Sequence, residues 1–462
     1  MDVDYKNEID ENDSERIPFA QNLENTEDED KETRIIAQID SFYNNFNRNL
    51  LNSYFFIYNV CRTINENIRS TLKDYNFSDL IVNSIISSDN INIKAQGMIS
   101  LGVYYIAFPS FIDHSFISNT SVSFISINEI TPELVEYIKG HLLLVNSFVT
   151  SYDLLKEIDN RFYSALPLYF LHPLLIKQSK YILSILTQSV KILSSIEDDE
   201  KDEIFNNICN DVVSASLSTI KHDSKSDYTQ ERTHLLLLIV HGNLINKENV
   251  EIQNAFNNVI LFENPNLKYI FDIVNATENF DNLYDDLIIQ AFEALASEIT
   301  EESDTIRISA MKLMTKLLEK DPKRFSSIFL CDDSIEYIQD IINIINNGTV
   351  NEFKHAGKLL SFIMQRFPQL FAKEIWWTTN DPNAANLPNA IDKFILYKQS
   401  RTQSFFLGLE CIASFMRIEN IDSQPFIEAL VNIGIKEKME EYINDDPEDE
   451  LAPFVYEDLF GQ

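Results

Sequence analysis

Two segments of this chain repeat one pattern of small, apolar and charged residues, and this repeat limits the possible folds more than any other feature. The segments are IRISAMKLMTKLLEKDPKRF at 306–325 and EFKHAGKLLSFIMQRFPQLF at 352–371, offset by 46 residues. Ala310 aligns with Ala356, and the lysine, leucine, proline and phenylalanine positions that follow also coincide. Apolar residues that recur every three or four positions predict helices. A helical unit repeated at such an interval predicts a chain of stacked helices.

A small residue opens each copy of the pattern, and residues of the predicted core face follow three and four positions later. A small side chain allows a neighbouring helix to approach closely. In three copies a proline stands twelve residues after the small residue, where it begins the next helix or ends the linker. The small residues are Gly97, Ala291, Ala310, Ala356 and Gly408, and the prolines are Pro109, Pro322 and Pro368.

This pattern resembles the armadillo/HEAT superfamily of α-solenoids, whose last helix reads roughly I-Q-x-x-A-x-x-A-L-x-N-L. Residues 306–314 and 93–101 match that helix best. The resemblance implies an all-α fold, a right-handed α-α superhelix of armadillo/HEAT-like type, over residues 34–443. It also implies a protein-binding surface, because the concave face of such solenoids is the usual place for a partner.

The two ends of the chain differ from the repeat region in composition. Residues 1–33 carry thirteen acidic and three basic side chains and few large apolar ones. Such a segment cannot bury enough apolar surface to offset the entropy of ordering, so we expect a disordered acidic tail. Residues 444–462 are also acidic, and we expect an acidic C-terminal tail or a terminal cap. Residues 108–130 have the weakest helical pattern, which leaves open a long loop or a short hairpin.

Charge and apolar runs exclude some classes of partner. The formal net charge is −35 at pH 7, which repels nucleic acid phosphates and anionic membrane surfaces. We therefore expect no nucleic acid partner. The longest purely apolar run, LLLLIV at 235–240, is far shorter than the roughly 20 residues needed to span a bilayer, so we expect no membrane insertion. The polar N-terminus is unlike a secretory signal, and the expected location is the cytoplasm or the nucleus.

The sequence contains none of the common catalytic motifs. HExxH, GxSxG, the phosphate-binding GxxxxGK[ST] and GxGxxG are all absent. His234 and His241 lie one heptad apart within an apolar run, which is more typical of histidines at the core edge than of a metal site. We therefore expect a protein that is not an enzyme and that holds no cofactor and no metal.

Basic residues at helical spacing in the two repeated segments predict a binding surface. Steps of four place Lys312, Lys316 and Lys320 on one helix face, and the repeat carries its own lysines. An ordinary solvated face is the alternative interpretation. The adjacent tryptophans are either core residues or binding anchors. The predicted partner-binding residues are Arg307, Lys312, Lys316, Lys320, Lys354, Lys358, Trp376 and Trp377.

We interpret the chain as a non-catalytic scaffold or adaptor that binds a protein or peptide partner on the solenoid surface. The alternative is a solenoid like the karyopherin transport receptors, which binds basic cargo through its acidic surface. In the importin-α branch of the family, tryptophan two residues after the small residue and asparagine six after it contact the bound peptide. No copy of the pattern carries this pair here.

Overall fold

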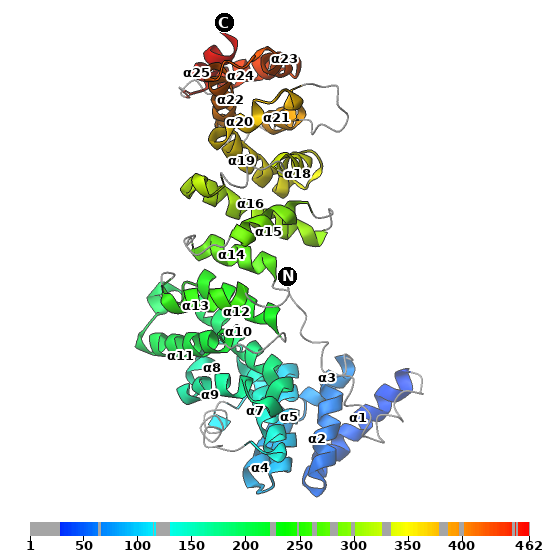
Figure 1. Cartoon of the computed structure of the whole chain (residues 1–462). Coiled ribbons are helices and arrows are strands. Elements are labelled where there is room, and N and C mark those ends of the chain that lie inside the picture. The colour runs from blue at the N-terminus through cyan, green and yellow to red at the C-terminus, as the bar shows by residue number, and fades with distance from the viewer. Residues whose placement is uncertain are drawn as a thin grey trace. The chain divides into compact units, whose positions relative to one another are not determined.

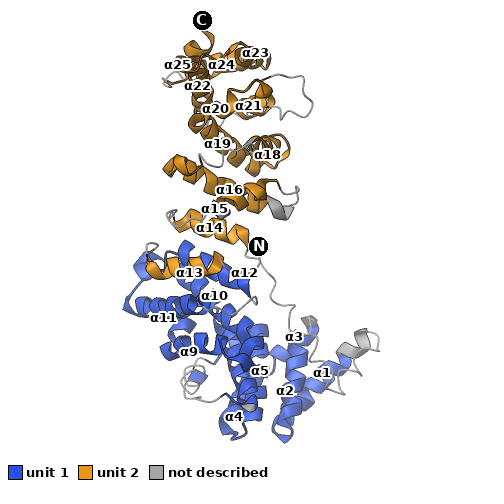
Figure 2. Cartoon of the chain, viewed as in Figure 1, with its two compact units in different colours: residues 1–245 blue, residues 246–462 orange. Residues whose placement is uncertain are grey.

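The computed structural model divides into two compact units, residues 1–245 and residues 246–462 (Figure 2). Every regular element within the described ranges is helical, which confirms the predicted all-α class. The described residues are 28–62, 66–113, 115–116, 130–221, 228–246, 249–260, 266–277, 285–296, 301–325, 334–377, 387–396, 402–445, 449 and 451–461.

The first helix of unit 1 begins earlier than the sequence pattern predicts. Helix α1 spans Asp28–Asn44, whereas the predicted helical region starts at residue 34. The last residues of the predicted acidic tail are therefore helical. Residues 1–27 of that tail lie outside the described residues.

The remaining helices of unit 1 pack side by side along the chain (Figure 1). Helix α2 contacts α5, α5 contacts α7, α7 contacts α10, and α10 contacts α12. Helix α4 packs on α5, and α11 packs on α9, α10 and α12. The bounds are α2 Leu50–Cys61, α3 Glu66–Lys73, α4 Phe77–Ser87, α5 Ile91–Ala107, α7 Pro132–Phe148, α8 Tyr152–Lys156, α9 Asn160–Phe170, α10 Ser179–Ser194, α11 Glu203–Ile220 and α12 Thr229–His241.

Small residues allow α5 to approach its neighbours closely. A Cβ atom on Gly140 of α7 would lie 2.6 Å from the carbonyl oxygen of Ala95 on α5. A Cβ atom on Gly97 would meet the side chains of Ile85 and Tyr54, which come from α4 and α2. The small residue of this copy of the pattern therefore has the packing role that the sequence predicts.

Unit 2 consists of two rows of helices that run along the chain together (Figure 1). In the first row, α14 contacts α16, α16 contacts α19, α19 contacts α22 and α22 contacts α25. In the second row, α15 contacts α18, α18 contacts α21 and α21 contacts α24. The first row comprises α14 Leu267–Thr277, α16 Glu301–Lys320, α19 Val350–Arg366, α22 Thr402–Ile418 and α25 Leu451–Phe460. The second row comprises α15 Asp285–Leu295, α18 Ser334–Asn347, α21 Leu387–Leu396 and α24 Ile435–Asp445. The unit also contains α13 Val250–Ile260, α20 Pro368–Phe371 and α23 Gln424–Asn432.

The sequence repeat corresponds to successive helices of the first row. Ala310, Ala356 and Gly408 lie on α16, α19 and α22, which contact one another in that order. Ala291 lies on α15, which packs on α16, as expected for two helices of one unit. Each proline of the pattern is the first residue of a short helix. These helices are the 3-10 helices η4 Pro109–Phe111 and η8 Pro322–Phe325, together with α20.

The structure describes most of the acidic C-terminal region, but only part of the weakly patterned region at 108–130. In the acidic C-terminal region, α25 packs on α22 and α24 and buries Ala452, Val455 and Leu459, so this part forms a packed terminal helix. Residues 117–129 of the weakly patterned region lie outside the described residues, and the choice between a loop and a hairpin remains a prediction there.

The close contact between α5 and α7 leads to a stability prediction for Gly140→Ala. The new methyl group would collide with a backbone oxygen, which cannot rotate away as a side chain can. Overpacking costs about 1–3 kcal/mol, and the gain in helix propensity offsets about 1 kcal/mol of it, so we expect a net loss of up to about 2 kcal/mol. Urea unfolding measures this loss. Ser164→Ala, at an exposed position on α9, is the control and should change stability little. An unfolding midpoint for Gly140→Ala at or above that of the unmodified protein would contradict the packing argument.

Candidate functional site

Helix α16 buries one side against its neighbours and leaves the opposite side open. Ala310, Leu313 and Leu317 are fully buried, as is the rest of the core side. The open side carries Lys312, which is exposed, and Lys316, which is half-buried. Residues four apart lie nearly above one another on a helix, so both lysines belong to the same face.

The next helix of the first row presents a similar open side. On α19, Lys354, Lys358 and Phe362 are half-buried, while Ala356, Leu359 and Leu360 on the other side are fully buried. Helices α16 and α19 pack side by side, and Lys358 of α19 forms an ion pair with Glu319 of α16 at 3.1 Å. The open sides of the two helices therefore form one surface. We call this surface the basic face and define it by Lys312, Lys316, Lys354, Lys358 and Phe362.

The lysines of the basic face differ in what they contact. The Lys316 ammonium group donates a hydrogen bond of 2.7 Å to the carbonyl oxygen of Asn275, in the last turn of α14. A cation at this place satisfies a carbonyl that the helix itself leaves unpaired. The Lys358 ammonium group lies 5.4 Å from the centre of the Phe362 ring in addition to its ion pair. Lys312 makes no ion pair or hydrogen bond with the residues that the structure describes. Lys320 is exposed at the end of α16, beside the basic face.

Arg307 does not belong to the predicted basic stripe, and this part of the prediction is wrong. Its side chain is only 1% exposed and forms an ion pair of 2.9 Å with Asp304. It forms a second ion pair with Glu352, which lies at the start of α19 and whose side chain is fully buried. Lys312 lies five positions after Arg307, a rotation of about 140° around an α-helix, so the two side chains point to different sides.

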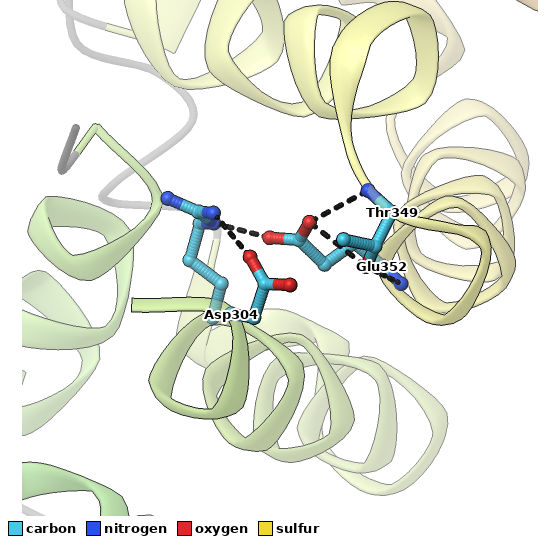
Figure 3. Close-up of polar contacts among 4 residues, drawn as sticks. Asp304, Thr349 and Glu352 are labelled. Carbon is cyan, nitrogen blue, oxygen red and sulfur yellow. Dashed lines mark hydrogen bonds and ion pairs between the residues drawn. The ribbon is translucent and has the colours of Figure 1, made fainter. Parts of the chain in front are cut away.

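The buried carboxylate of Glu352 also completes the start of α19 (Figure 3). The backbone N–H of Thr349 donates to Glu352 Oε2 at 2.8 Å, and the Thr349 hydroxyl accepts from the backbone N–H of Glu352 at 3.4 Å. This is a capping box, and the sequence TVNE at 349–352 carries its pattern of threonine followed three residues later by glutamate. That local signal was available in the sequence, but it does not reveal the arginine on α16.

Trp376 and Trp377 are core residues and not binding anchors, which corrects the second part of the site prediction. Each is 3% exposed. The indole N–H of Trp376 donates to the carbonyl oxygen of Leu370 at 2.8 Å, and that of Trp377 donates to Phe371 at 2.6 Å. The Trp377 ring also packs edge-on against Phe426, with ring centres 4.5 Å apart. Both indoles therefore satisfy their donors inside unit 2, as buried tryptophans generally do.

Comparisons with known proteins supply no family for this chain. No protein-family model matches the sequence, and no curated protein matches it significantly. Among the described residues, no group of three or more His, Cys, Asp and Glu side chains is placed to hold a metal ion. No helix in the described part of the chain is both long enough and apolar enough to cross a membrane.

The buried ion pair predicts a large effect of Arg307→Met. This substitution leaves the Glu352 carboxylate buried without its cation, which costs about 3–5 kcal/mol. Urea unfolding should show this loss, and Arg307→Met/Glu352→Gln should lose less than the sum of the two single variants, because the double variant leaves no unpaired charge. Arg417→Met removes the exposed ion pair with Asp458 and serves as the control, with an expected loss of at most about 1 kcal/mol. Additive losses for the Arg307 and Glu352 variants would show that the two side chains do not act as a pair.

The same carboxylate predicts a particular pH dependence. Burial alone raises the pKa of Glu352, but the hydrogen bonds from Thr349 and Arg307 outweigh it, and its pKa lies below the ordinary glutamate value. A carboxylate with a lowered folded pKa adds stability that is present above its unfolded pKa of about 4.3 and is lost as the pH falls through the folded value. The stability difference between the unmodified protein and Glu352→Gln should therefore shrink as the pH is lowered from 7 towards about 3. Urea unfolding across this range measures the difference, and a constant difference would contradict the pairing.

Proposed function

We propose that this chain is a non-catalytic scaffold of armadillo/HEAT type that binds a protein or peptide partner. The support for the fold type is the match between the sequence repeat and the successive helices α16, α19 and α22 of the first row. Proteins built from such repeats bind partners along the surface that neighbouring repeats share. The scaffold function therefore assigns the partner to a surface that spans several helices.

The observation that carries the proposal is the position of the basic face. It lies on two adjacent helices of the first row, and its side chains are exposed or half-buried while the opposite sides of both helices form the core. The chain as a whole has a net charge of −35, so a local excess of lysine is a marked contrast in potential. Complementary potentials at interfaces fix the register of partners and suppress wrong ones.

The alternative function is that of a transport receptor which takes basic cargo through its acidic surface. Helix α24 presents such a surface, because Glu437, Glu440 and Glu441 are all exposed. The two functions place the partner on different helices of unit 2. A crosslinker placed on each helix therefore distinguishes the two functions by the helix on which it captures a partner.

Site-specific photo-crosslinking tests the proposal. A benzoylphenylalanine replaces Phe362 in the basic face, Glu441 on α24, or Asn343, an exposed residue of α18 in the second row. We expect the Phe362 position, in native cell extract, to give a discrete crosslinked protein that mass spectrometry identifies and that the Asn343 control does not give. A product from Glu441 and none from Phe362 would support the transport-receptor function, and the same products from all three positions would contradict a defined binding surface.

A further inference from the structure

We propose that the basic face binds an acidic, extended protein segment whose carboxylates stand three residues apart. This inference rests on the proposed scaffold function and adds the chemistry of the partner. The lysines of the basic face are exposed or half-buried on neighbouring helices, so a segment that crosses these helices meets cations from both. Charge complementarity selects a negatively charged occupant for this surface.

The spacing of the two helices determines the spacing of the carboxylates. Packed helices lie about 8–10 Å apart, and an extended segment in the polyproline II conformation advances about 3.1 Å per residue and, with three residues per turn, carries its side chains at i and i+3 on the same side. A segment that runs across α16 and α19 therefore moves from one helix to the next in about three residues. Carboxylates at positions i and i+3 then reach Lys312 on α16 and Lys354 or Lys358 on α19.

The existing contacts of the lysines indicate which of them responds to a partner. Lys312 is exposed and has no ion pair within the described part of the chain, so a carboxylate can approach it directly. Lys358 is already paired with Glu319, and a partner's carboxylate has to compete with that residue. Lys316 is committed in part to the end of α14. Exposed ion pairs are individually weak, so binding needs several of them together and weakens as salt is added.

The helices on either side of the basic face argue against a nucleic acid as the occupant. The neighbouring helix α14 presents Asp272, and α22 presents Glu410, and both side chains are half-buried on the same row. A nucleic acid strand carries a negative charge at every nucleotide, so a strand that continues beyond the basic face meets repulsion on both sides. A short acidic stretch in a protein segment can end before either carboxylate. The geometry therefore favours an acidic peptide of limited length.

Fluorescence anisotropy with synthetic peptides and the full chain tests the inference. The probe carries three glutamates, each separated by two neutral residues. One comparison peptide has the same composition with the glutamates adjacent, and another has glutamine in place of glutamate. A single-stranded oligonucleotide tests the other class of anion. We expect the spaced peptide to bind more tightly than all three, and its Kd to rise about tenfold when salt is raised from 50 to 300 mM.

Charge reversal locates the binding. Lys312→Glu/Lys354→Glu should raise the Kd of the spaced peptide about tenfold or more. Lys191→Glu/Lys373→Glu changes the net charge equally at two exposed positions outside the basic face, and we expect it to change the Kd less than twofold. Circular dichroism should show the same helical signal for both double variants.

Several results would overturn the inference. Equal weakening in both double variants would show that only the total charge matters, and tighter binding of the oligonucleotide would assign the surface to nucleic acid. Equal affinity for the spaced and adjacent peptides would contradict the three-residue spacing. If the crosslinker at Phe362 captures a protein while no acidic peptide binds, the partner chemistry is wrong and the scaffold function stands. If the acidic peptide binds but no protein is captured, the scaffold function loses its support while the chemistry of the surface stands.

Discussion

A buried ion pair between Arg307 of α16 and Glu352 of α19 ties together the two helices that carry the basic face. An ionised side chain without a partner is costly in the protein interior, so arrangements of the two helices that separate these buried charges are disfavoured. Glu352 also caps the start of α19 through Thr349, so the contact between helices and the start of the second helix share one carboxylate. This contact thus favours, together with the apolar core that the helices share, the position of α19 against α16 and the alignment of their lysines.

Some basic side chains of unit 2 are paired inside the protein, whereas others are exposed to solvent. Arg307 is neutralised inside the protein, and Lys316 and Lys393 donate to carbonyl oxygens near the ends of α14 and α18. Lys312, in contrast, remains exposed on the open side of its helix. A count of basic residues therefore overstates the charge that a partner meets. The surface that we propose for binding therefore carries fewer cations than the sequence suggests, and it lies on α16 and α19.

Small residues have a complementary role, because they set the distance between helices. In unit 1, Gly140 brings the backbone of α7 against α5, and in unit 2 Gly357 accommodates the ring of Phe394, which a Cβ atom would strike at 2.0 Å. Close approach increases the apolar area that each helix buries against its neighbour. Two of the repeated small residues have the same role, because a Cβ atom on Gly97 would lie 2.6 Å from the side chain of Ile85 and one on Gly408 would lie 3.0 Å from that of Met364.

Much of the fold follows from the sequence alone, because helical periodicity, caps and proline positions act locally. The spacing of apolar residues predicts the all-α class, and the aligned Ala310 and Ala356 predict equivalent helices, which proved to be successive members of one row. Thr131 and Pro132 likewise begin α7 as their local pattern predicts. What the sequence could not decide is which side of a helix its neighbours cover. Arg307 is buried and pairs with Glu352, a residue 45 positions away. Trp376 and Trp377 are also buried, and their indole N–H groups donate to carbonyl oxygens within the core. Lys312, in contrast, is exposed. These outcomes depend on which helix faces pack against each other, and only the tertiary structure determines that packing.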